Sequence, residues 1–171
     1  MTANNGKWIT HVDVLDHALA GNGAFLVVED QDRSANPMTI GWASLGRIWS
    51  IPTLTILVRR SRYTYGLLLQ KDSFSVSVPS GEDLSQELDF CGRNSGRNMD
   101  KAARCGISLI PGRKVSAPVV EGCMLYYECQ IILRKQLMRD DFSDSGIIQS
   151  YYKDGDHHMI VIGRVVCIYT D

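Results

Sequence analysis

The chain has 171 residues, of which 44% are hydrophobic and 22% are charged, and its net charge is −1. This length fits one globular domain over residues 1–171 with a core of its own. The near-neutral charge argues against a nucleic-acid-binding protein.

The N-terminus lacks the apolar stretch of a signal peptide, and no apolar run reaches the roughly 18 residues of a membrane span. The five cysteines contain no CxxC pair. Neither a disulfide framework nor a zinc site is therefore expected. We expect a soluble, cytoplasmic protein with reduced cysteines, no metal site and no membrane partner.

The apolar segments are short and rich in β-branched and aromatic residues, which indicates strands. In chain order, strands are predicted at 25–28, 53–58, 73–78, 124–133 and 159–169, and helices at 13–19, 61–70, 84–90 and 101–105. Because the alternation of strands and helices typical of a doubly wound sheet is missing, we predict an antiparallel barrel with helical insertions.

Details of the pattern add local expectations. Residues 73–78 alternate polar and apolar at period two, which predicts a half-buried strand. Gly163 suggests a bulge or a sharp bend in the last strand. Ser61 or Thr64 could cap the second helix. Charged or glycine-rich stretches predict loops at 29–36, 92–100 and 139–155, the last of them the longest.

Residues 36–44 form a segment that could hold a flat ligand, and we expect it on a strand. Its small residues would let a ring approach the backbone, its hydroxyls could bind a ring edge, and its tryptophan offers apolar contact. The small residues are Gly41 and Ala43, the hydroxyls belong to Thr39 and Ser44, and the tryptophan is Trp42. Taken alone, the segment is explained more simply as an ordinary strand with a core tryptophan.

Residues 59–64 read Arg-Arg-Ser-Arg-Tyr-Thr between a predicted strand and a predicted helix. The first turn of a helix has unpaired N–H groups and the positive end of the dipole, so a phosphate could bind here. A solvated basic turn with a serine cap is an equal alternative. The strand-then-helix context favours the phosphate site.

Residues 91–101 form a polar loop with the cations Arg93, Arg97 and Lys101. The loop could close over an anion, although its spacing fits neither GxGxxG nor the P-loop. A solvated surface loop explains it more simply.

His157 and His158 are adjacent before the last strand. On an extended chain they point to opposite faces, so they are poor joint ligands for one metal. One of them could face a site, although a solvated histidine is the commoner case.

Taken together and in this order, these segments resemble the flavin reductase-like, FMN-binding split-barrel family, particularly its flavoredoxin-like branch. The matching patterns are N-x-M-T-x-x-W-x-S at 36–44, the basic turn at 59–64, F-x-V-x-V-P at 74–79, G-x-x-S-G-R-x-x-D-K at 92–101, and D-H followed by G-x-V at 156–165. The resemblance spans about residues 22–168 and implies a mainly β, antiparallel Greek-key split barrel with a few short helices. His158 and Arg164 depart from the family pattern, which bears on substrate preference.

The resemblance also implies ligands and contacts. It implies bound FMN, NADH or NADPH as electron donor, and a homodimer with the flavin near the interface. Its phosphate residues would be Arg59, Ser61, Arg62, Tyr63 and Thr64; its ring residues Asn36, Met38, Thr39, Gly41, Trp42, Ala43 and Ser44; and its loop residues Ser95, Arg97 and Lys101. His157 would bind or protonate the nicotinamide.

The activity implied by the resemblance is that of an NAD(P)H-dependent flavin reductase, which transfers hydride from a nicotinamide to flavin. Two alternatives stay open. One is a flavoredoxin-like electron carrier, and the other is a flavin-binding protein without turnover.

Overall fold

The computed structural model describes residues 11–31 and 34–170. Its strands are β1 (Ala24–Asp30), β2 (Ser34–Ile40), β3 (Ala43–Ile48), β4 (Ile51–Arg59), β5 (Ser73–Val78), β6 (Leu109–Ile110), β7 (Val119–Val120), β8 (Leu125–Gln136) and β9 (His158–Thr170). Its helices are α1 (Val12–Ala20), α2 (Tyr63–Gln70), α3 (Ser85–Arg93), α4 (Lys101–Cys105), the 3-10 turn η2 (Arg139–Asp141) and α5 (Ser145–Tyr151). Within these ranges, none of the helices is long and apolar enough to cross a membrane.

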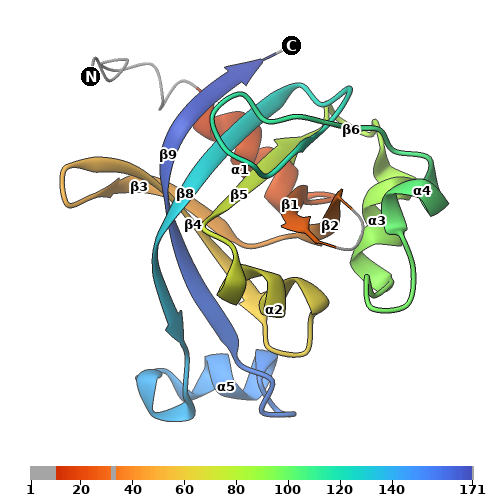
Figure 1. Cartoon of the computed structure of the whole chain (residues 1–171). Coiled ribbons are helices and arrows are strands. Elements are labelled where there is room, and N and C mark those ends of the chain that lie inside the picture. The colour runs from red at the N-terminus through yellow and green to blue at the C-terminus, as the bar shows by residue number, and fades with distance from the viewer. Residues whose placement is uncertain (1–10, 32–33, 171) are drawn as a thin grey trace.

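The main sheet has the strand order β2-β1-β5-β8-β9-β4-β3, and its neighbouring strands pair antiparallel. β2 and β3 lie at opposite edges, yet only Gly41 and Trp42 separate them in the chain. Because three peptide steps span at most about 11 Å, the sheet must curl until its edges approach each other (Figure 1). This confirms the predicted mainly β, antiparallel split-barrel class with short helices.

The sheet buries a core on each face. Inside the curl, Leu26, Leu54, Phe74 and Tyr127 belong to one cluster of buried residues. On the outer face, a second cluster packs under α3, α4 and the β6–β7 pair. Its members include Phe25, Val27, Leu88, Ala102, Val119 and Tyr126. Because both faces of the sheet are covered, its central strands carry apolar residues on both faces.

Strand β5 differs from the prediction of half burial, because all six of its residues are buried. The segment before β8 covers its outer face. There the hydroxyl of Ser75 donates to the carbonyl of Pro118, and the Ser77 hydroxyl accepts from the amide of Val120. The serines of the alternating pattern are therefore buried and hydrogen-bonded, and do not face solvent.

Residues 36–44 do not lie on one strand as predicted. They cover the end of β2, the connection Gly41–Trp42 and the start of β3. The break arises because the chain passes here from one edge of the sheet to the other.

The predicted caps of the second helix are also wrong, since α2 begins after Arg62 without a side-chain cap. The hydroxyls of Ser61 and Thr64 have tertiary partners instead. The Ser61 hydroxyl lies 2.6 Å from an Asp156 carboxylate oxygen, and Thr64 accepts from Asn36 at 2.8 Å.

The predicted loop 139–155 contains two helical pieces, η2 and α5. The carboxylate of Asp144 accepts from the amide of Gly146 at 2.7 Å and starts α5. Tyr152 is buried beside Phe142 and His157, with ring centroids 5.1 and 5.0 Å away. Aromatic packing and a local cap therefore order this polar segment.

Gly163 lies at the predicted irregularity, because the β8–β9 register shifts where Ile131 pairs with Gly163 and Leu133 with Ile162. A Cβ atom on Gly163 would lie 2.7 Å from the Phe74 ring and from the Cβ of Cys129. We expect Gly163→Ala to lower the free energy of unfolding by about 2 kcal/mol through this overlap. Urea denaturation followed by tryptophan fluorescence measures it.

Gly46→Ala in β3 is the matched control for this change, since a Cβ atom there meets nothing within 4 Å. Replacing the ring by a smaller side chain, with Phe74→Leu in the Gly163→Ala background, should recover part of the lost free energy of unfolding. Equal midpoints for the two glycine variants would contradict the overlap argument.

Candidate functional site

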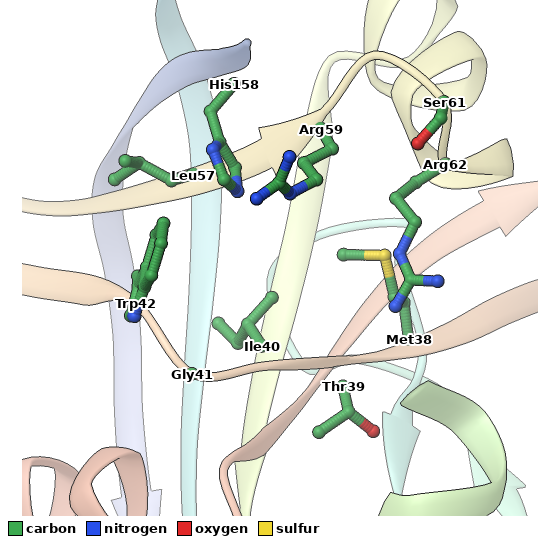
Figure 2. Close-up of a pocket in the computed structure, with 10 residues that line it drawn as sticks. All are labelled: Met38, Thr39, Ile40, Gly41, Trp42, Leu57, Arg59, Ser61, Arg62 and His158. Carbon is green, nitrogen blue, oxygen red and sulfur yellow. The ribbon is translucent and has the colours of Figure 1, made fainter. Parts of the chain in front are cut away.

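Two adjoining cavities lie where β2 ends, beside the turn between β4 and α2. The wide cavity has a volume of about 450 Å³ and is lined by Met38, Thr39, Ile40, Gly41, Trp42, Leu57, Arg59, Ser61, Arg62 and His158 (Figure 2). The narrow cavity has about 120 Å³ and is lined by Met38, Ser61, Arg62, Tyr63, Thr64, Arg93, Asn94, Ser95, Gly96, Arg97 and Lys101. Because they share Met38, Ser61 and Arg62, they form one elongated site.

The walls of the wide cavity follow from strand register. Arg59 on β4 pairs with His158 on β9, and side chains directly opposite each other in an antiparallel pair lie on the same face. On β2, Met38 and Ile40 point toward the cavity, whereas Thr39 points to the other face, where its hydroxyl donates to the carbonyl of Leu88 (Figure 2). Thr39 therefore lines the cavity through its backbone.

The wide cavity has two chemically different ends. Trp42 and His158 lie at one end, and Arg62 and Ser61 lie at the other (Figure 2). The centroids of the Trp42 and His158 rings are 5.0 Å apart. An aromatic end and a cationic end suit a ligand that carries a flat ring and an anion.

The narrow cavity is strongly cationic. Its lining contains Arg62, Arg93, Arg97 and Lys101, and among these described residues there is no carboxylate. Lys101 is only 3% exposed, and its Nζ donates to the carbonyl of Cys91 at 3.2 Å. Burial, and to a lesser extent Arg62, lowers the pKa of Lys101 to about 8. A bound anion would therefore stabilise the ammonium form of Lys101.

Thr64 lines the narrow cavity and is hydrogen-bonded to Asn36, which lines neither cavity. The Asn36 side-chain amide donates to the Thr64 hydroxyl at 2.8 Å, and both residues are buried. A Cβ atom on Gly96 would lie 2.1 Å from the Asn36 side-chain oxygen. The glycine lets the loop before α4 pack directly on β2 and the start of α2.

Arg59 and Ser61 hold the turn against the start of β9. The Arg59 guanidinium donates to the carbonyls of Tyr151 and Asp156 at 2.8 and 3.0 Å. The carboxylate of Asp156 accepts from the backbone amide and the hydroxyl of Ser61. Whether these two side chains also bind a phosphate stays a prediction.

His158, and not His157, lines the wide cavity. Burial, and next the Arg59 charge, lowers the pKa of His158 to about 4, so the imidazole is neutral at pH 7. The hydroxyl of buried Tyr152 lies 2.8 Å from His158 Nδ1. Because a buried hydroxyl needs an acceptor, we assign Nδ1 as the acceptor and place the ring proton on Nε2.

His157 stacks on Tyr152, and its Nδ1 lies 2.9 Å from the carbonyl of Gly155. Sequence reasoning assigned a role to His157 and not to His158, because the register of the last strand cannot be read from the sequence alone. It also missed Ile40 and Leu57, both of which line the wide cavity. The signal that identifies His158 and Leu57 is strand register. Leu57 lies two residues before Arg59 on β4, on the same face, and His158 is the partner of Arg59 on β9.

Most of the predicted contact residues come together at this site. The wide cavity holds Met38, Thr39, Gly41, Trp42, Arg59, Ser61 and Arg62, and the narrow cavity adds Tyr63, Thr64, Ser95, Arg97 and Lys101. The described residues Asn36, Ala43, Ser44 and His157 line neither cavity. Their predicted contacts with a ligand stay predictions.

Comparison with known proteins identifies a family and a relative of this chain. A family model described as "Flavin reductase like domain" matches residues 18–171. An uncharacterized protein of Archaeoglobus fulgidus is 28% identical over 108 residues, which are 63% of this chain and 59% of that protein. The chain thus matches less than two thirds of that curated relative's length.

Solved structures share the fold. An FMN-binding protein of Thermus thermophilus, with bound p-hydroxybenzaldehyde, is 26% identical with a TM-score of 0.64, over 86% of this chain and 70% of that one. Flavoredoxin of Desulfovibrio vulgaris (Miyazaki F) is 24% identical with a TM-score of 0.68, over 86% of this chain and 68% of that one. The likeness to flavoredoxin is one of fold.

Proposed function

The chain belongs to the family of flavin reductase like domains, and we propose that it is an oxidoreductase that binds FMN across the wide and narrow cavities. In this proposal NADH or NADPH is the electron donor, and hydride passes from the nicotinamide to the bound flavin. The FMN-binding protein of Thermus thermophilus, with the same fold, supports the choice of nucleotide.

The narrow cavity is the observation that carries this proposal. It joins four cations, with no carboxylate among its described lining residues, to a wide cavity with apolar and aromatic walls. A buried ammonium such as that of Lys101 is costly unless an anion completes its site. FMN has the matching two-part chemistry, a phosphate at one end and a flat ring system at the other.

In this proposal, different residues of the two cavities contact different parts of FMN. Lys101, Arg62 and Arg97 would hold the phosphate by charge-assisted hydrogen bonds. Ile40, Leu57 and Trp42 would contact the ring system through apolar surface. Bound FMN would supply the redox chemistry itself.

His158 would act as a hydrogen-bond donor in the wide cavity. Its Nδ1 is occupied by Tyr152, so the Nε2–H remains for the ligand. A neutral donor can bind a ring oxygen or nitrogen without changing the charge of the site. Beside it, Trp42 and Tyr151 are 40% and 50% exposed and meet edge to face, which leaves an open aromatic rim where a nicotinamide could stack.

The test is the absorption spectrum of the purified protein with added FMN, recorded anaerobically before and after NADH or NADPH. We expect a bound-flavin spectrum that bleaches with a nicotinamide. A flavin spectrum that stays oxidised with both donors would instead support a flavoredoxin-like carrier or a binding protein without turnover. No binding of FMN would contradict the proposal.

A further inference from the structure

A third cavity of about 400 Å³ lies along helix α2 and adjoins the narrow cavity. Arg62, Tyr63 and Arg97 line both the narrow and the third cavity. The wide cavity shares Arg62 with the third one, but neither Tyr63 nor Arg97. The three cavities therefore follow one another, with the cationic narrow cavity in the middle.

The third cavity is also cationic. Among the described residues, its lining contains Arg60, Arg62, Lys71 and Arg97 against one carboxylate, that of Asp30. That carboxylate accepts from the Tyr63 hydroxyl at 3.0 Å, and Lys71 lies 3.4 Å from Glu29. Arg62 and Arg97, which line both the narrow and the third cavity, and Arg60, which lines only the third, provide positive charge for a second anionic group.

The third cavity also offers surface for a planar group. Tyr63 and Tyr65 are part of its lining, and both residues are half-buried. Aromatic side chains stack on nucleobases without selecting among them. Gly66 lies between these tyrosines and Leu67 on α2, and a Cβ atom there would meet nothing within 4 Å.

We propose that the third cavity takes the adenylate half of a flavin dinucleotide, so that this protein binds FAD more tightly than FMN. This inference rests on the proposed flavin site. FMN ends at the phosphate in the narrow cavity and would leave the third cavity unused. In FAD the second phosphate follows the first directly, beside Arg62 and Arg97, and the adenosine continues toward Arg60 and the two tyrosines. The cavity volume lies within the range of about 300–1,000 Å³ that is usual for small-molecule sites.

The experiment titrates flavin-free protein with FMN and with FAD at one ionic strength and follows quenching of flavin fluorescence. For the wild type we expect FAD to bind at least about tenfold more tightly than FMN, since one additional charge-assisted contact is enough for such a ratio. Gly66→Leu should fill the third cavity and remove this preference. Its FMN affinity should stay within about twofold of wild type, because Gly66 does not line the narrow or the wide cavity.

Gly66→Ala is the matched control. It makes the same change to the helix backbone without filling the cavity, so it should keep the preference for FAD. Arg60→Ala, which removes a cation that lines only the third of these cavities, should weaken FAD about tenfold and leave FMN unchanged. Folding of Gly66→Leu is checked by its retained FMN affinity.

Equal affinities for FMN and FAD in the wild type, or an equal loss of both in Gly66→Leu, would overturn the inference and leave the proposed FMN site intact. If the wild type binds neither nucleotide, the proposed function and this inference both fail.

Discussion

Lys101→Met is expected to weaken FMN binding by about 30-fold, or about 2 kcal/mol, while the free protein stays at least as stable as wild type. The variant removes a buried ammonium whose Nζ donates to a backbone carbonyl, and the described residues that line the narrow cavity include no carboxylate. Without a ligand this charge is costly, and with a phosphate it is satisfied. Fluorescence titration with FMN measures the affinity, and urea denaturation measures the stability.

Arg104→Met on the same helix is the control, because Arg104 is exposed and lines none of the three cavities. It should leave FMN affinity within about twofold of wild type. An equal loss of affinity in both variants would show that general surface charge, and not the buried ammonium, attracts the nucleotide.

The pH dependence gives a separate test of Lys101. Its pKa is lowered from 10.5 to about 8, so between these values the unfolded chain holds a proton that the folded protein has lost. The Lys101 contribution to the free energy of unfolding therefore rises with pH in this window. The thiols of buried Cys91 and Cys129 and of half-buried Cys167 have raised pKa values and act in the opposite direction above pH 9.

The useful quantity is therefore the difference between Lys101→Met and wild type, in which the cysteine contributions largely cancel. The stability advantage of the variant should shrink between pH 8 and pH 10.5. Wild-type affinity for FMN should fall over the same window, as the ammonium is lost, and the variant should not show this fall. Parallel pH profiles of affinity would contradict a role for Lys101 in phosphate binding.

Glu128→Ala is expected to lower the free energy of unfolding by about 3 kcal/mol and Tm by about 10 °C. The side chain is fully buried on β8, and its carboxylate accepts from the backbone amides of Arg113, Lys114 and Val115. Next to it, burial and then the Glu128 charge raise the pKa of Tyr169. The carboxylate thus anchors the segment that covers the outer face of β5.

Glu121→Ala is the control for Glu128→Ala, because Glu121 is exposed. Glu128→Gln should lie between the two, since its amide oxygen still accepts hydrogen bonds but carries no charge. FMN affinity should be unchanged in all three variants, because Glu128 lines none of the three cavities. A loss from Glu128→Ala no larger than that from Glu121→Ala would show that the loop is held in another way.

Local patterns in the sequence predict most of the elements of this fold. Period-two alternation and β-branched residues locate β4, β5 and β9, and helix signals locate α1 to α4 within a few residues. The bulge at Gly163 is also visible in the sequence, because a glycine inside an apolar strand commonly marks a bulge or a bend. These features depend on residues close to one another in the chain.

The sequence predicts the geometry of the candidate site less completely than it predicts the fold. The motifs indicate Arg62, Ser95, Arg97 and Lys101 near an anion, and the narrow cavity brings these residues together. The motifs do not indicate that the hydroxyl of Thr39 faces α3, that Asn36 binds Thr64, or that Asp156 holds Ser61. Each of these contacts joins segments far apart in the sequence.

The sequence by itself therefore determined the strands, the short helices, the antiparallel class and the set of polar residues available for a site. The tertiary structure alone decided which hydroxyls and cations line a cavity, which histidine faces the wide one, and that β5 is buried on both faces. The physical reason is that the backbone pattern of an element depends on its own neighbours. The hydrogen-bond partner of a polar side chain depends instead on which distant strand the register places beside it.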